Sequence, residues 1–252
     1  MKSITLSFAI FVLALLAPDL SAQTADEIIK SYFDNTGGKS NWESLEALKF
    51  TGTLDFDTMQ LPVTMIQTKE GLTLLSANVQ GQEFYQSVYD GETLWSTNQQ
   101  TFEAEKMDSE ATENYQLGIQ DFPDPFLNYK AKGYQVELLG TELIEGTETY
   151  KIKLEKKPKM VNGVATPNVE YYYFEKENRV PILVEKQVAI GPNGYIDGQS
   201  KLSDYQEVDG LYFPFSIADG TKDRPNAQRI TIIGVEVNPE IDPAIFEYPN
   251  KN

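Results

Sequence analysis

Carboxylates are the most plentiful groups in this chain that could carry out chemistry, with 38 Asp and Glu against 21 Lys and Arg in 252 residues. Two carboxylates can serve as acid and base, as in glycoside hydrolysis. The individual acids, however, stand where solvent exposure or turn formation explains them. They are Asp55 and Asp57 on the polar side of a predicted strand, Asp90 and Asp209 before glycines, and Asp121, Asp124 and Asp242 near prolines. We therefore predict no catalytic residue, and a hydrolase with buried paired acids remains an alternative.

Histidine and cysteine are both absent. Their absence excludes Ser-His-Asp and Cys-His nucleophile systems, thiolate chemistry and the usual zinc sites. The sequence also lacks a calcium-binding loop, a phosphate-binding glycine loop and a dinucleotide fingerprint. We predict that the protein needs no metal and no cofactor.

An aromatic run, Tyr171-Tyr172-Tyr173-Phe174, could form a platform for a sugar or a base. Side chains alternate between the two faces of a strand, so at most half of this run can line one site. The preference of aromatic residues for strands explains the run equally well. We place Tyr171 and Tyr173 on the side of a binding cavity, where a hydroxyl group could meet the polar end of a ligand.

The N-terminus has the form of a secretory signal peptide. Lys2 precedes an apolar run over residues 4–16, and Leu20-Ser21-Ala22 forms a small-residue cleavage site. The run is shorter than the roughly 20 residues that span a bilayer, although an N-terminal anchor remains an alternative. We predict cleavage after Ala22 and residence in the periplasm. The net charge of −17 predicts no nucleic-acid partner and repulsion from anionic lipid headgroups.

The elements that would position a site are mostly strands. In residues 48–57 apolar Leu48, Phe50, Leu54 and Phe56 alternate with polar residues, and Gly52 leaves a gap on the apolar side that indicates a bulge, a bend or a close approach. Further β-type segments are separated by turn signals such as Glu145-Gly146, Asn162-Gly163, Asn193-Gly194 and Asp209-Gly210. We expect about a dozen strands in one antiparallel sheet, a number that favours curling or closure.

Helices and an irregular connection should cover the apolar face. Thr24-Ala25-Asp26-Glu27 forms a capping box for a first helix, and a second short helix is expected from Ser40. Residues 102–134 lack strand alternation and contain apolar side chains, including Phe122 and Phe126. This stretch is either a lid that folds onto the apolar face or a plain connection.

Several pieces in this order resemble the outer-membrane lipoprotein-sorting protein family, whose members look like the periplasmic carrier LolA. They are Ala25-Asp26-Glu27-Ile28-Ile29 with Gly37-Gly38, Tyr89-Asp90-Gly91 with Trp95, Tyr150-Lys151-Ile152, Ser203-Asp204-Tyr205 with Asp209-Gly210, and Asn238-Pro239 with Phe246. The resemblance implies an unclosed antiparallel β-barrel around a cavity for acyl chains. It also implies partners in the inner and outer membranes. The family's lid-bonding basic residue has no counterpart in the opening strand, where Lys49 faces the polar side.

We therefore expect a mainly β (α+β) protein with a signal peptide over residues 1–22 and one half-barrel domain over residues 23–252. Its predicted function is to carry or bind lipoproteins or other acylated ligands, as a monomer. An envelope interaction or sensor module with the same fold is the alternative. The residues expected to line the apolar cavity are Phe50, Leu54, Phe56, Leu72, Leu74, Phe84, Val88, Tyr171, Tyr173, Ile230 and Ile232, with Phe122 and Phe126 on the lid.

Overall fold

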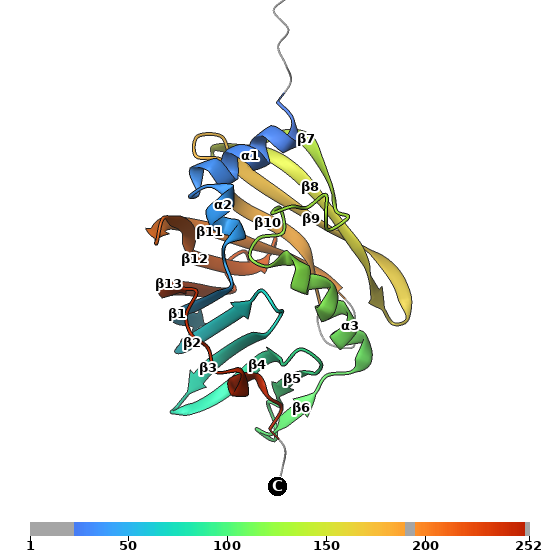
Figure 1. The fold of residues 1–252 in the computed structure, drawn as a ribbon, viewed down its shortest axis with the longest axis vertical. Helices are drawn as coiled ribbons and strands as arrows, with labels where there is room; N and C mark the ends of the chain where they lie inside the picture. The colour runs from blue at the N-terminus through green and yellow to red at the C-terminus, as the bar shows by residue number, and fades with distance from the viewer. Residues whose placement is uncertain (1–22, 190–194, 250–252) are drawn as a thin grey trace, which may run out of the picture.

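One antiparallel sheet dominates the computed structural model, which describes residues 23–189 and 195–249. Its thirteen strands follow the order β6-β5-β4-β3-β2-β1-β13-β12-β11-β10-β9-β8-β7 (Figure 1). They are β1 Ala47–Phe56, β2 Met59–Thr68, β3 Thr73–Val79, β4 Gln82–Tyr89, β5 Leu94–Thr97, β6 Ala104–Lys106, β7 Gln135–Ile144, β8 Thr147–Val161, β9 Val164–Glu175, β10 Pro181–Ala189, β11 Tyr195–Val208, β12 Leu211–Thr221 and β13 Gln228–Val237. Strands β6 and β7 are its unpaired edges, so the expected unclosed barrel is confirmed.

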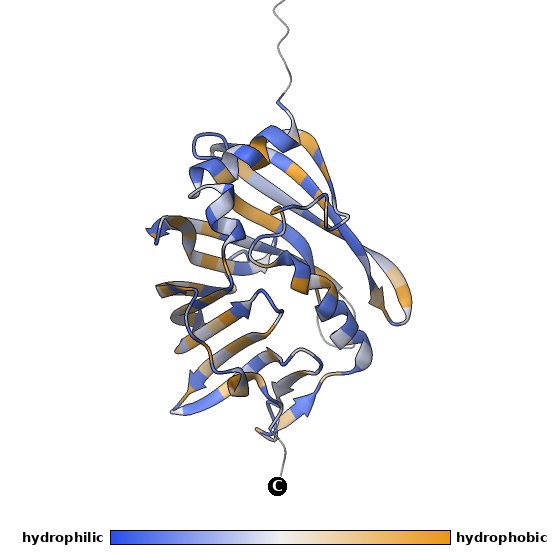
Figure 2. Ribbon diagram, in the orientation of Figure 1, coloured by the Kyte–Doolittle hydropathy of each residue, from blue (hydrophilic) through white to orange (hydrophobic). Residues whose placement is uncertain are grey.

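The hairpin turns have the geometry that the glycine pairs predict. At Glu145-Gly146, Asn162-Gly163 and Asp209-Gly210 both residues have positive φ, as type I′ turns require. The Asn193-Gly194 turn and the signal peptide lie outside the described residues. Hydrophobic and hydrophilic bands alternate along the strands (Figure 2). Strand β6 was missed by the sequence reasoning, because its three residues are too few for an alternation to be recognised.

Two N-terminal helices cover one end of the sheet (Figure 1). Helix α1, Ala25–Asn35, begins with the predicted capping box at Thr24 and Glu27, and its buried stripe includes Ile28, Tyr32 and Phe33. Helix α2, Lys39–Glu43, begins after Gly38 and has no side-chain cap, so the cap expected at Ser40 is wrong. The indole Nε1 of Trp42 donates to Thr36 at the end of α1, 3.1 Å away, which fixes α2 against α1.

Both faces of the sheet are partly covered. The face that carries α1, α2 and residues 119–134 is called the inner face here, and it holds the largest hydrophobic cluster. On the outer face, Ile66, Leu74, Val88 and Trp95 form a second cluster with Phe246, which belongs to the short helix η3, Pro243–Phe246. The Trp95 indole donates to the Phe246 carbonyl at 2.9 Å. Among the described residues, no helix combines the length and apolar composition needed to cross a bilayer.

Candidate functional site: an apolar groove beneath a lid segment

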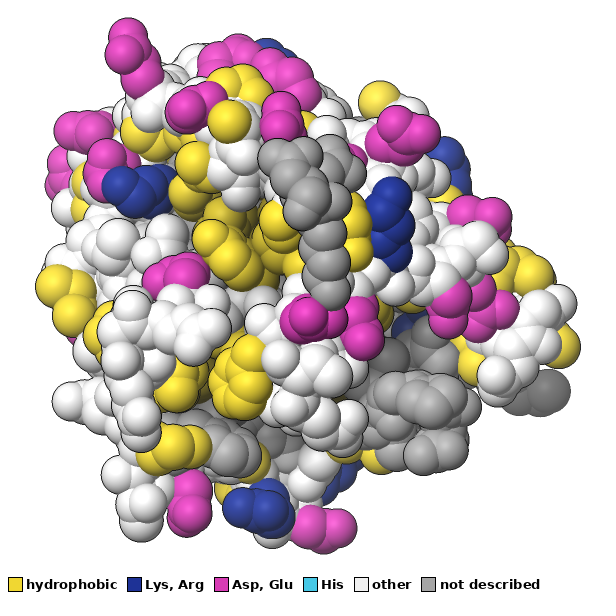
Figure 3. Space-filling model, turned by 90° about the horizontal axis from the view of Figure 1, so that it is seen from below, with side chains coloured by type: hydrophobic (Ala, Val, Ile, Leu, Met, Phe, Trp, Pro, Cys, Tyr) yellow, Lys and Arg dark blue, Asp and Glu magenta, His cyan; other side chains and the backbone are white. Residues whose placement is uncertain are grey.

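A cavity of about 290 Å³ lies on the inner face, between the middle of the sheet and the segment that crosses it. The side chains that line it include Phe50, Met65, Tyr172, Leu202, Phe213 and Ile232, from strands that are far apart in sequence. Viewed from below, hydrophobic side chains gather around a hollow in the middle of the molecule (Figure 3). We call this cavity and its apolar lining the groove.

Strand pairing explains how these residues meet. Phe50 pairs with Met65, and Gly52 pairs with Val63 on one side and Ile232 on the other. Directly paired residues of antiparallel strands point to the same face. The β1–β13 register shifts between Thr51 and Gly52, where a Cβ on Gly52 would collide with the carbonyl oxygen of Thr231. Gly52 therefore marks both a bulge and a close backbone approach, two of the readings that the sequence left open.

A lid segment, defined here as residues 109–134, lies over the groove. It begins with α3, Ser109–Gly118, continues through the short helix η1, Ile119–Asp121, and ends in a loop before β7. Phe126 is only 2% exposed. Its ring packs edge-on against Tyr172 and Phe174, with centroids 4.7 and 5.4 Å away. Phe122 is partly buried against the same cluster, so both predicted lid residues face the inner side.

Helix α3 buries none of its residues and is held by polar contacts at both sides. Asn114 exchanges two hydrogen bonds of 2.7 Å with the backbone of Met160, and Glu110 accepts from the amides of Asn162 and Gly163. On the other side Gln116 donates to the hydroxyl of Tyr89 at 2.9 Å. The helix thus connects the β8–β9 hairpin with β4 across the open side of the sheet.

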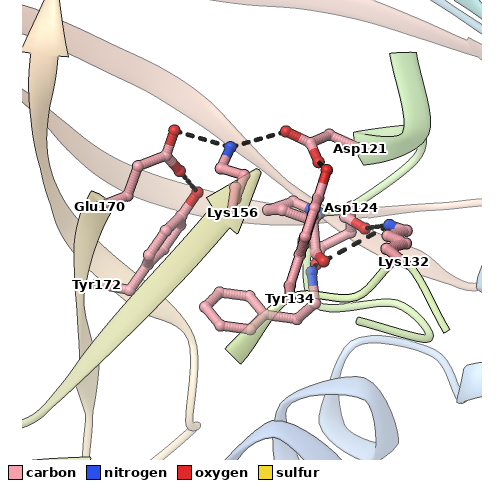
Figure 4. A network of polar contacts seen from close by, with 9 residues as sticks. Asp121, Asp124, Lys132, Tyr134, Lys156, Glu170 and Tyr172 are labelled. Atoms are coloured by element: carbon pink, nitrogen blue, oxygen red, sulfur yellow. Dashed lines mark hydrogen bonds and ion pairs between the residues drawn. The ribbon is translucent and has the colours of Figure 1, made fainter. Parts of the chain in front are cut away.

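A buried ionic network fixes the lid loop to the sheet (Figure 4). The ammonium of Lys156 on β8 lies 2.7 Å from Asp121 of the lid segment and 2.8 Å from Glu170 of β9. Tyr134 donates to Asp121 and Tyr172 donates to Glu170. Burial alone would lower the pKa of Lys156, but Glu170 and Asp121 outweigh it and the pKa is raised. Burial opposes ionisation of Glu170, but Lys156 prevails and the pKa of Glu170 is lowered.

A second contact ties the lid loop to α1. The carboxylate of Asp124 accepts from the Tyr32 hydroxyl at 2.9 Å and from the Phe126 amide at 2.8 Å, and Lys132 donates to the Asp124 backbone carbonyl. Burial raises the pKa of Asp124 to about 6, although these hydrogen bonds partly oppose it. The side chain of Asp124 also lines the groove, so its ionisation changes the groove's charge near neutral pH.

The structure brings several predicted cavity residues together on the inner face. Phe50 and Ile232 line the groove. Leu54 and Ile230 lie beside it, in contact with Val63 and Ala77. Phe84 pairs with Ala77 and so shares this face, but its ring contacts Phe102 at the β5–β6 turn instead of the groove. The side chain of Phe56 lies outside the described part of the chain.

The remaining predicted cavity residues lie on the outer face, and these assignments are corrected. Leu74 and Val88 pair with each other and pack on the C-terminal segment, and Leu72 joins them. Tyr173 pairs with Leu183 and donates to Glu185, and Tyr171 pairs with Glu185. The inner residues of the aromatic run are Tyr172 and Phe174. Alternation separates the residues of a strand into two sets, but it does not identify the inner set when both faces are covered.

Sequence reasoning also missed residues of the groove and its network. Met65 could have been predicted from the sequence. A two-residue turn at 57–58 pairs Phe56 with Met59, and counting back along the two strands then pairs Phe50 with Met65. Lys156 gave no such signal, because its partners lie 35 and 14 positions away along the chain. In the described residues, no group of His, Cys, Asp or Glu is arranged to hold a metal ion.

Comparisons with known proteins show the fold. No family profile matches the chain, and no curated protein sequence matches it. Among solved structures, a DUF1329 family protein from Desulfovibrio piger is 12% identical and covers 87% of this chain and 97% of its own, with a TM-score of 0.54. A LolA superfamily protein from Nitrosomonas europaea is also 12% identical and covers 90% and 98%, with the same TM-score.

A putative outer membrane lipoprotein-sorting protein domain from Vibrio parahaemolyticus is 10% identical and covers 87% of this chain and 94% of its own, again with a TM-score of 0.54. At these identities the likeness is one of fold. The chain has a LolA-like fold, an open antiparallel β-barrel with helices on its inner face.

Proposed function

We propose that the protein binds and carries acylated ligands, lipoproteins or lipids, in the periplasm, with an acyl chain held in the groove. The observation that supports this most is the chemistry of the groove's lining. The tyrosine hydroxyls at its inner end already donate within the protein, Tyr32 to Asp124, Tyr172 to Glu170 and Tyr205 to the Pro181 carbonyl. What remains for a ligand is mainly ring, methyl and methylene surface, and each buried methylene contributes about 0.8 kcal/mol.

The size of the groove sets a limit on its ligand. The groove's volume of about 290 Å³ is at the small end of ligand pockets, which begin at about 300 Å³. The closed groove thus accommodates part of one acyl chain. A longer or second acyl chain requires Phe126 and Phe122 to leave the inner face.

Residence in the periplasm follows from the signal peptide predicted over residues 1–22 and fits the fold of the sorting domain from Vibrio parahaemolyticus. A carrier there would receive its cargo from a component of the inner membrane and deliver it to one of the outer membrane. We propose components of this kind as its partners.

The direct test is to purify residues 23–252 from a periplasmic extract and to analyse organic-solvent extracts by mass spectrometry. We expect a co-purifying lipid, or uptake of a fluorescent fatty acid that unlabelled lipid displaces. Met65→Trp would fill the groove and should reduce uptake at least tenfold. Ile233→Trp is the matched control, because Ile233 lies next to groove-lining Ile232 but is 69% exposed. Absence of any bound or exchangeable lipid would count decisively against the proposal.

An interaction or sensor module is a second candidate, favoured by the burial of Phe126. In this second candidate function, the ring of Phe126 stays packed against Tyr172 on the inner face and leaves no room for an acyl chain. The chain would then bind a partner protein through its outside, and lipid uptake would be absent in the wild type as well as in Met65→Trp. Pull-down from envelope extracts should recover one protein in that case.

A further inference from the structure

The inner face extends beyond the groove toward the end of the sheet where β10 and β12 end. Leu202, Ile217 and Ile230 pair side by side across β11, β12 and β13. The next inner-face row, about 7 Å further along the strands, is Ser200, Asp219 and Gln228. The lining therefore changes from apolar to polar within one step toward the open end.

A second hollow of about 440 Å³ lies at this polar end, and we call it the rim pocket. Ser200, Asp219 and Gln228 belong to its lining, together with Lys186 and Arg224. Val188 and Ile196 supply an apolar wall and are 41% and 39% exposed, which is high for side chains of their size. The rim pocket thus offers polar and apolar contacts one inner-face row beyond the groove.

Two cations, Lys186 and Arg224, lie in the lining of the rim pocket. Most lysines of the described residues pair with a carboxylate, as Lys222 does with Glu185 at 3.2 Å. Among those residues, the side chains of Lys186 and Arg224 have no hydrogen bond or ion pair. Lys186 lies opposite Glu170 on β9 and helps to lower the pKa of Glu170, but the Glu170 carboxylate is already bonded to Lys156 and Tyr172. Two cations that form no ion pair of their own therefore line one hollow, where an external anion could contact both.

The charges facing this pocket are not all positive. Asp219 lies one row deeper than the cations and accepts a hydrogen bond of 2.5 Å from Ser200. An anion that moved further inward would meet this carboxylate, so Asp219 would keep a charged group at the rim. Lys186 also borders a neighbouring hollow of about 370 Å³, which Lys159 and Lys222 line as well, together with Glu185 and Asp197.

We propose that the rim pocket binds the anionic headgroup, a phosphate or a carboxylate, of an amphiphile whose hydrocarbon chain lies in the groove. This inference rests on the proposed function and names its ligand class. The hydrocarbon chain of the ligand enters over Leu202, Ile217 and Ile230, while Lys186 and Arg224 contact its headgroup. The net charge of −17 repels anions at long range, so the two cations attract the headgroup only at short range. Because both cations are exposed to water, they contribute selectivity between headgroups more than total affinity.

The test compares two ligands with the same hydrocarbon chain, dodecyl phosphate and monododecanoyl glycerol, by calorimetry with residues 23–252. We expect the phosphate to bind about three- to tenfold tighter at low salt, and the preference to shrink as ionic strength rises. The double variant Lys186→Gln/Arg224→Gln should bind both ligands equally, with unchanged affinity for the glycerol ester. Lys157→Gln, which changes an exposed lysine outside the rim pocket, should retain the preference.

Equal affinity of the wild type for both ligands would overturn the inference and leave the proposed function standing. A preference that survives in the double variant would overturn it too. If neither dodecyl phosphate nor monododecanoyl glycerol binds, the inference and the proposed function are both overturned. Inorganic phosphate is the third arm: if it displaces dodecyl phosphate at equal concentration, the pocket is a site for free phosphate and not for an amphiphile.

Discussion

Replacement of Lys156 by methionine should both destabilise the protein and release its lid segment. The Lys156 side chain is 10% exposed, and its two carboxylate partners Glu170 and Asp121 are 12% and 23% exposed. Removing one member of a buried ionic group costs about 3–5 kcal/mol, because the remaining charges stay buried without compensation. Glu170 and Asp121 keep their tyrosine hydroxyl donors, and Asp121 retains some contact with water. We therefore expect a loss near the lower end, about 3 kcal/mol.

Urea unfolding would measure this loss, and hydrogen exchange of residues 119–134 would report on the lid segment. Lys153→Met is the matched control on the same strand, since Lys153 pairs with Glu155 at 2.7 Å but both side chains are far more exposed. It should cost less than about 1 kcal/mol. Adding Glu170→Gln to Lys156→Met should recover part of the loss, because one unpaired charge is removed. Equal losses for Lys156→Met and Lys153→Met, or unchanged exchange in the lid segment, would refute this reasoning.

Three further predictions concern the groove and its cover. Gly52→Ala should lower the free energy of unfolding in urea by more than about 2 kcal/mol, because the new methyl group meets the Thr231 carbonyl. Gly118→Ala is the control and should be tolerated, because no atom lies within 4 Å of its new Cβ. Phe126→Ala should cost about 3–5 kcal/mol but enlarge the groove and admit bulkier fluorescent lipids; exposed Phe102→Ala should do neither. Because burial raises the pKa of Asp124 from 3.8 to about 6, its contribution to stability is present at low pH and is lost as pH rises through about 6. Asp124→Asn should therefore gain stability relative to the wild type between pH 4 and 7, and a constant difference over that range would contradict the assignment.

Much of the fold could be predicted because strand alternation and turn chemistry are local. Residues 48–57 keep strict alternation around Gly52, and the structure has Phe50 and Leu54 on the inner face as predicted. The two-residue turns set the register of the strand pairs next to them, as type I′ geometry requires. Further from the turns, irregularities shift the register of β7–β8 and of β8–β9, and no local signal predicted them. Meander order then follows from short connections, which place consecutive strands side by side.

Which side chains enter the groove was less predictable, because several strands are covered on both faces. In β3 and β4 the outer face is as apolar as the inner one, since the C-terminal segment around Phe246 packs against Leu74 and Val88. A strand buried on both faces carries no alternation signal that distinguishes them. The aromatic run in β9 has the same ambiguity, and only its pairing with β8 and β10 assigns Tyr172 to the inner face.

The ionic network bears on the proposed carrier function, which requires the lid segment to leave the groove when a long acyl chain binds. A lid held only by hydrophobic burial would compete with an acyl chain for the same surface and would resemble a filled core. Here the lid loop buries Phe126 but is fixed through Lys156 and Asp124, whose interactions depend on charge and on pH. Replacing a buried ionic group by apolar side chains is often neutral or stabilising, so the presence of this network is not by itself a sign of high stability. If the lid segment opens as the proposed function requires, the polar contacts broken on opening can be replaced by contacts with water.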